Sequence, residues 1–196
     1  MPVAFVLLAY KTRIMDLHII ETGYFKLDGG AMFGVVPKVI WQKTNPADEK
    51  NLCAWAMRCL LIEDGDKLIL VDTGIGNKQD ENFLKHYYLH GGASLESSLN
   101  TRGFSIDDIT DVFLTHLHFD HCGGAVRWKD RDKKIPEMRF KNARYWSNEA
   151  HWKWATEPNA REKASFCFQP SGSAATSRRF ASFSCNSANS SSVRFL

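Results

Sequence analysis

Short apolar stretches along the chain alternate with glycine- and aspartate-rich segments, which is the pattern of strands joined by turns. Residues 17–25 alternate loosely between apolar and polar positions and predict a strand that ends at a turn around Asp28-Gly29-Gly30. Residues 54–63 and 67–72 predict two more strands, and Asp64-Gly65-Asp66 between them is a hairpin signal. The first third of the chain is therefore predicted to form antiparallel sheet.

The second third predicts helices that lead into a further strand. Residues 82–90 and 94–100 have helical patterns, so His86 and His90 could share one helix face, and we interpret both as surface or pocket-rim residues. Ser105 and Asp108 have the spacing of a capping box before a short helical turn. The apolar run at residues 112–114, whose residue types are common in strands, then predicts a buried strand.

Later segments are less regular. The charged stretch 127–134 predicts a solvated loop or a helix end, and residues 138–146 predict a strand. Ser147 is predicted to cap a helix that carries His151 between aromatic neighbours, where a histidine is most often packed or at a rim.

Composition adds bounds on size and partners. A chain of 196 residues can bury one good core, and 44% hydrophobic with 24% charged residues is ordinary for a globular protein. The formal charge of +3 is too small to argue for nucleic acid as a partner. The five cysteines form no C-x-x-C pair, which suits a reducing compartment and predicts a cytoplasmic location.

The two ends differ from the middle of the chain. Residues 1–14 contain an apolar run that is too short to span a bilayer and lacks signal-peptide features, so no membrane association is predicted. We treat 1–14 as an extension, with Met15 as an alternative start. Residues 166–196 contain no Asp or Glu and are rich in serine, which predicts a weakly structured tail. The tail could bind an acidic partner or be the product of a frameshift, and we favour the frameshift.

The segment with the clearest chemistry carries His116, His118, Asp120 and His121 within six residues. It follows the predicted buried strand and precedes Gly123-Gly124, where the backbone is expected to come close to another segment. Imidazole nitrogens and carboxylate oxygens are ligands that zinc accepts. Two ligands on each side of the loop favour a pair of divalent metals. A cluster of solvated loop histidines is the less favoured alternative.

The spacing His116-x-His118-x-Asp120-His121, together with the glycine pair and Asp72-Thr73-Gly74, resembles the metallo-β-lactamase-fold hydrolases. The resemblance implies an α/β fold, the four-layer αββα sandwich, over residues 15–165. These residues correspond only to the first half or so of a typical member, so only the N-terminal half of the sandwich is expected to be complete. Residues 30–37 resemble the lactonase and organophosphate-hydrolase-like branch.

The resemblance also implies roles for individual residues. Two zinc ions would activate a hydroxide that attacks an ester or lactone, with Asp120 as the catalytic group that holds or relays the proton. Asp72 would accept hydrogen bonds that hold the metal loop, although a plain turn cap is the alternative. Met32 and Phe33 could line an apolar substrate pocket, or equally pack in the core. The lactonase-like branch would add a quorum-quenching role.

The family's remaining metal ligands come from its second half, and no histidine follows His151 in this chain. Each metal would then keep about two protein ligands where a catalytic zinc has three, so weak metal binding is expected. Three hypotheses follow: a metal-dependent hydrolase of a small ester or lactone, a truncated and catalytically silent chain, or an iron-dependent oxidoreductase of the same fold.

Overall fold

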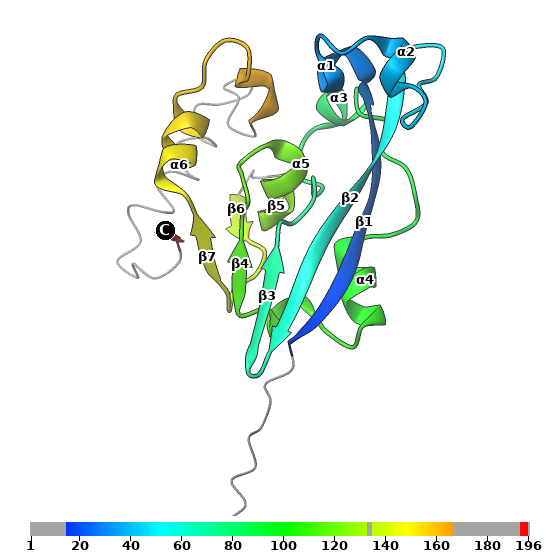
Figure 1. Cartoon of the computed structure of the whole chain (residues 1–196). Helices are drawn as coiled ribbons and strands as arrows, with labels where there is room; N and C mark the ends of the chain where they lie inside the picture. The colour runs from blue at the N-terminus through cyan, green and yellow to red at the C-terminus, as the bar shows by residue number, and fades with distance from the viewer. Residues whose placement is uncertain (1–14, 133–134, 167–192, 196) are drawn as a thin grey trace, which may run out of the picture.

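The computed structural model describes residues 15–132, 135–166 and 193–195 (Figure 1). The predicted N-terminal extension and most of the predicted tail lie outside these described residues. The described chain forms a mixed α/β structure, which confirms the predicted class.

A six-stranded sheet is the centre of the structure (Figure 1). The first three strands pair antiparallel, and each later strand in the order pairs parallel with its neighbour. In spatial order the strands are β1 (Asp16–Asp28), β2 (Leu52–Asp64), β3 (Lys67–Val71), β4 (Asp111–Phe113), β7 (Arg144–Ser147) and β8 (Val193–Phe195). A separate two-stranded sheet consists of β5 (Val126–Asp130) and β6 (Ile135–Met138).

The helices are short and lie mainly in the connections between strands. They are α1 (Gly29–Phe33), α2 (Lys38–Trp41), α3 (Glu81–Leu84), α4 (Leu95–Thr101), α5 (Phe119–Cys122) and α6 (Glu149–Thr156), with 3-10 turns at Ile106–Asp108, Gly123–Ala125 and Lys163–Ser165. Among the described helices, none combines the length and the apolar character needed to cross a membrane.

One face of the main sheet builds the core. Leu61 on β2 lies opposite Leu70 on β3, which lies opposite Val112 on β4, and all three side chains are fully buried. Leu95 and Leu99 of α4 belong to the same buried cluster. Burying an aliphatic side chain contributes about 1.5–3 kcal/mol, so this face supplies much of the folding free energy.

The other face of the sheet carries the alternate residues and is left open. Leu17 and Ile19 on β1 are 61% and 58% exposed. Their partners across β2 are Ile62 and Leu60, which are only partly buried. This face is therefore apolar but incompletely covered by the described residues.

Several local predictions are confirmed. The predicted hairpin joins β2 to β3, and Gly65 at its turn has a φ of 66°, which favours glycine. The capping box forms as predicted, because the Asp108 carboxylate accepts hydrogen bonds from the backbone nitrogen and hydroxyl of Ser105, both at 2.7 Å. The turn predicted at Asp28-Gly29-Gly30 is instead the start of a helix, because Asp28 is the N-cap of α1.

Other predictions are wrong. The helix predicted over residues 82–90 ends at Leu84, and His90 instead pairs with the edge strand by exchanging backbone hydrogen bonds with Tyr24. The surface-helix face shared by two histidines therefore does not form. The charged stretch from residue 127 is part of strand β5, where Arg127 pairs with Glu137 across the hairpin at 2.9 Å.

The region after this hairpin also differs from the prediction. Residues 138–146 do not form one strand, because β6 ends at Met138 and the chain turns before β7 begins at Arg144. The cap of α6 is Asn148, one residue after the predicted Ser147, and its side chain accepts from the nitrogens of Ala150 and His151. Residues 193–195 at the end of the predicted tail form β8.

Candidate metal centre

The histidine loop begins where two parallel neighbouring strands end. β3 ends at Val71 and β4 ends at Phe113, and the Asp72 nitrogen donates to the Phe113 carbonyl at 2.9 Å. Because parallel strands end at the same edge of a sheet, the segment after β3 lies beside the segment after β4. The sheet therefore holds the Asp72 turn against the loop that carries the histidines.

The glycine pair after the histidines locks the loop to this turn. The Gly124 nitrogen donates to the Gly74 carbonyl at 2.8 Å. A Cβ atom at Gly124 would lie 2.2 Å from the Thr73 carbonyl oxygen, and a Cβ atom at Gly123 would lie 2.2 Å from the Ile75 carbonyl oxygen. Such distances exclude any side chain without a backbone shift, so the expected close approach at these glycines is confirmed.

Asp72 is the centre of a buried hydrogen-bond network behind the loop. Its Oδ1 accepts from the Thr115 nitrogen at 2.9 Å, and its Oδ2 lies 2.8 Å from both the Thr115 hydroxyl and His121 Nδ1. The residue is 8% exposed and has a φ of 60°, a strained value for a non-glycine residue. In this backbone conformation the Asp72 carboxylate bonds both Thr115 and His121, which offsets the strain.

Thr115 extends the network to a second histidine. Its hydroxyl oxygen lies 3.1 Å from His116 Nδ1. A carboxylate is the stronger acceptor, so the single hydroxyl proton points to Asp72 and the oxygen accepts from His116 Nδ1–H. One carboxylate thus orients His121 directly and His116 through Thr115. This leaves Nε2 of His116 as the acceptor that a metal requires, whereas Nε2 of His121 faces the Asp120 carboxylate at 3.4 Å.

The three loop histidines lie together. The ring of His116 is 3.9 Å from that of His121 and 4.7 Å from that of His118, measured between ring centroids. Helix α6 brings a fourth ring, that of His151, to 6.5 Å from His116. Asp120 Oδ2 is 3.4 Å from His121 Nε2. The four residues predicted as ligands are therefore neighbours in space as well as in sequence.

The residue types fit the chemistry of a divalent metal, but their side chains are not arranged around one ion. Neutral imidazole and carboxylate are zinc ligands. Within the described parts of the chain, however, no three or more His, Cys, Asp or Glu side chains are arranged to hold one ion together. Cys122 does not add a metal ligand to this arrangement. Its side chain is buried, and its thiol donates a hydrogen bond to the Leu117 carbonyl at 3.4 Å.

The protonation of the histidines follows from their surroundings. Burial, with the charges that His121 and His118 would carry, lowers the pKa of His116 to about 4. Burial likewise lowers the pKa of His118. For His121 burial also lowers the pKa, but the hydrogen bond to Asp72 and the charge of Asp120 outweigh it and raise the pKa. His116 and His118 are thus neutral at neutral pH, the form that binds metal.

A small crevice of about 60 Å³ opens beside the loop and is lined by Asp72, Asp120 and His121, with Phe25 and Met57 on its apolar side. Met32 and Phe33, the residues proposed for the substrate pocket, do not line it. Phe33 stacks on Trp41 with 4.7 Å between ring centroids, and Met32 is 44% exposed. The pocket role of these two residues remains a prediction.

Of the residues near the site, Thr115 was assigned no role from sequence, and His151 was interpreted as a packed or rim residue. Thr115 carried one available signal, since it stands directly before the first histidine of the signature and its hydroxyl can bond a neighbouring imidazole. His151 had no local signal, because only the packing of α6 beside the loop brings its ring close.

Comparisons with known proteins agree with this geometry. The sequence profile of the Metallo-beta-lactamase superfamily matches residues 58–182. An N-acyl homoserine lactonase of Bacillus cereus is 27% identical over 128 residues, which are 60% of this chain and 49% of that protein. The chain thus spans about half the length of this curated relative.

Solved structures give the same result. A probable metal-dependent hydrolase from Staphylococcus aureus is 32% identical with a TM-score of 0.70, over 77% of this chain and 53% of that one. AidC, a dizinc quorum-quenching lactonase, is 27% identical with a TM-score of 0.56, over 74% of this chain and 45% of its own. With a profile match over more than half of its length and the histidine loop at the expected sheet edge, the chain belongs to the metallo-beta-lactamase superfamily.

Proposed function

We propose that this chain contributes to a metal-dependent hydrolase that cleaves a small ester, with a lactone as the expected substrate. The observation that carries the proposal is the buried Asp72 carboxylate, which orients His121 directly and His116 through Thr115, in each case at Nδ1. The similarity to lactonases supports the substrate class, and the quorum-quenching role is proposed on the same basis.

His116, His118, Asp120 and His121 are the residues that would hold the two metal ions, with zinc the metal proposed. When bound, such ions lower the pKa of a water molecule to about 7 and polarise the carbonyl of the substrate. The cytoplasmic location is proposed from the thiols, since Cys53, Cys59 and Cys122 are buried and form no disulfide.

The residues of the chain have separable tasks. Asp72 fixes the tautomer of His121 and, through Thr115, that of His116. Asp120, whose Oδ2 lies 3.4 Å from His121 Nε2, is the carboxylate that would hold or relay the proton. The apolar wall of the crevice, with Phe25 and Met57, excludes water from one side.

The test combines metal analysis with hydrolysis by the purified chain. We expect zinc to bind and N-hexanoyl-homoserine lactone to be hydrolysed, and His118→Ala to abolish the hydrolysis and weaken zinc binding. His86→Ala is the matched control, because His86 is exposed and outside the cluster, and it should change neither quantity.

Each other outcome selects another hypothesis. A chain that binds zinc but hydrolyses no ester or lactone would be catalytically silent as it stands. Co-purified iron, with redox activity that depends on the same histidines, would favour the oxidoreductase. Equal activity of the wild-type chain and the His118→Ala variant would refute the role of the loop.

A further inference from the structure

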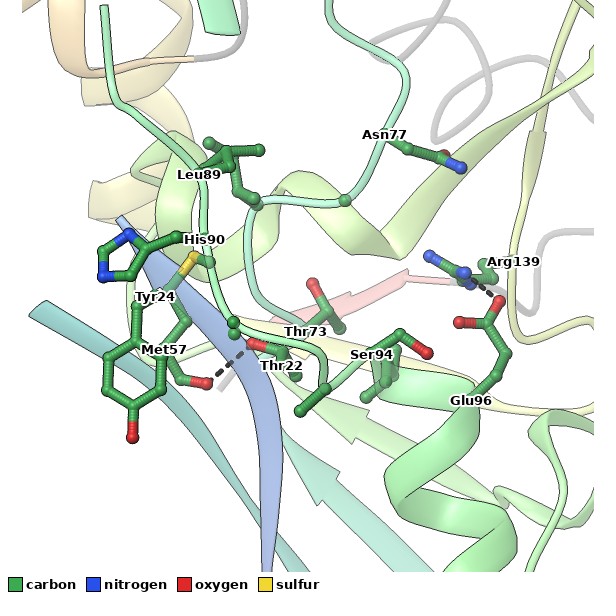
Figure 2. A pocket seen from close by; sticks show the side chains of 16 residues that line it. Thr22, Tyr24, Met57, Thr73, Asn77, Leu89, His90, Ser94, Glu96 and Arg139 are labelled. Atoms are coloured by element: carbon green, nitrogen blue, oxygen red, sulfur yellow. Dashed lines mark hydrogen bonds and ion pairs between the residues drawn. The ribbon is translucent and has the colours of Figure 1, made fainter. Parts of the chain in front are cut away.

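A second, larger cavity of about 260 Å³ lies on the other side of the turn that follows β3 (Figure 2). Alternate residues of this turn face the two spaces: Asp72 and Gly74 line the crevice beside the histidines, whereas Thr73 and Ile75 line the larger cavity. The cavity is therefore distinct from the candidate metal centre, although Thr73 connects them by donating to the His121 carbonyl at 2.9 Å.

The wall of this cavity contains a buried cation. Arg139 is 7% exposed, and its Nη2 pairs with Glu96, whose own side chain is 42% exposed. The Nε–H of the same guanidinium is buried and has no hydrogen-bond partner among the described residues. A buried donor without a partner costs about 1–3 kcal/mol, so an acceptor from a ligand would be favoured here. Figure 2 shows the guanidinium and Glu96 together on the cavity wall.

The rest of the wall limits the kind of ligand. Leu89, Leu95 and Met57 form an apolar patch on the wall, and the polar residues Thr22, Thr73, Asn77, His90 and Ser94 line the rest. A guanidinium presents a planar fork that suits a carboxylate. Glu96 stands beside it and disfavours a doubly charged group such as phosphate. The wall thus combines the Arg139–Glu96 ion pair, uncharged polar groups and a smaller apolar patch.

We propose that this cavity is a binding site for a small aliphatic carboxylate, with its carboxylate on Arg139 and its hydrocarbon chain against the apolar wall. The volume of about 260 Å³ is slightly below the usual range for ligand pockets, which fits a small ligand. No residue predicted as a metal ligand lines the site, although Met57 lies between this cavity and the crevice.

The test is isothermal titration calorimetry of the full chain with hexanoate, compared with 1-hexanol and inorganic phosphate. Hexanoate should bind saturably and more tightly than the other two. Arg139→Gln should weaken hexanoate at least about tenfold, the size expected when a hydrogen bond to a charged group is lost. Glu96→Gln should instead tighten hexanoate binding, because it removes the competing carboxylate.

The matched control is Arg127→Gln, which removes an arginine and its ion pair with Glu137 outside the cavity and should leave binding unchanged. If Arg139→Gln does not fold, Arg139→Lys keeps the charge without the fork and should still bind more weakly. No saturable binding, hexanol or phosphate binding as tightly as hexanoate, or no gain from Glu96→Gln would each overturn the proposal.

Discussion

The two faces of the central sheet are made from the same strands and have similar residue types, but they differ in burial. On the covered face Leu61 and Leu70 are fully buried, whereas on the open face Leu17 and Ile19 remain more than half exposed. In a sheet with one face exposed to solvent, apolar and polar residues normally alternate along each strand, so that the polar ones lie on the exposed face. Here both faces are apolar, which is the pattern of a sheet that packs on both sides.

This difference in burial separates the face that forms the core from the face that the described residues leave uncovered. The covered face and its helices form a core that holds the histidine loop at the sheet edge. The open face matches a family whose fold has a second layer, and the chain spans about half the length of its relatives. We therefore expect stability to depend on the covered face, and association to depend on the open one.

The largest expected effect comes from neighbouring residues on β2 that face opposite sides. Leu61→Ala removes a fully buried side chain and should cost about 2–5 kcal/mol in the free energy of unfolding. Ile62→Ala, on the open face, should cost less than about 1 kcal/mol because less area is lost from contact. Urea unfolding of both variants measures the difference, and equal losses would show that the open face is covered in solution.

The next effect concerns the loop that continues the covered face. Gly124→Ala would place a Cβ atom 2.2 Å from the Thr73 carbonyl oxygen, so we expect a loss of about 1–3 kcal/mol and weaker zinc binding. Gly92→Ala is the control, since a Cβ atom there meets nothing within 4 Å. Thermal unfolding and zinc titration check both. If Gly124→Ala changes neither the stability nor the zinc affinity, the loop can separate from the Asp72 turn.

A smaller effect is expected for the hydroxyl that joins the turn to the first histidine. Thr115→Val removes hydrogen bonds to Asp72 and His116 and should weaken zinc binding about tenfold, as is typical for residues behind metal ligands. Thr101→Val removes a hydroxyl bonded only to the Ser97 carbonyl and should leave zinc binding unchanged. Unaltered zinc affinity in Thr115→Val would contradict the tautomer-fixing role.

The metal-free loop should also make stability depend on pH. The folded-state pKa of His116 is lowered to about 4, below its usual value of 6.5, so the unfolded chain takes up its proton first as the pH falls. The stability contributed by His116 is therefore complete above pH 6.5 and is lost between pH 6.5 and about 4. His116→Gln should flatten this part of the stability curve in metal-free protein. An unchanged slope would show that the ring is solvated.

Sequence reasoning succeeded where the cause is local. The β2–β3 hairpin follows from a glycine turn between apolar runs, and the Ser105 cap from two residues three apart. It failed where distant segments decide the outcome. Residues 127–130 form a strand that is held by contacts with other segments. Arg127 forms an ion pair with Glu137 across the hairpin, and the Trp128 indole donates a hydrogen bond to the Lys78 carbonyl at 2.8 Å.

The candidate site divides in the same way. The four predicted ligands could be named because they lie within six consecutive residues. Asp72 could be named because of the resemblance to the metallo-β-lactamase-fold hydrolases. The larger cavity could not be predicted, since segments around residues 22–24, 73–77 and 89–96 meet Arg139 only in the folded chain. A buried arginine in a sequence looks like any other arginine until its neighbours are known.

The smallest effect on stability is expected on the open face itself. Replacing Leu17 and Ile19 together by threonine places a β-branched residue, which suits a strand, at both positions and removes exposed apolar area. The free energy of unfolding should change by less than about 0.5 kcal/mol, as for ordinary surface substitutions. Binding of a hydrophobic dye and self-association in sedimentation should both decrease, because a large exposed apolar patch favours contact with other molecules. A loss of stability as large as that of Leu61→Ala would mean that the two faces contribute alike, and the distinction between a covered and an open face would fail.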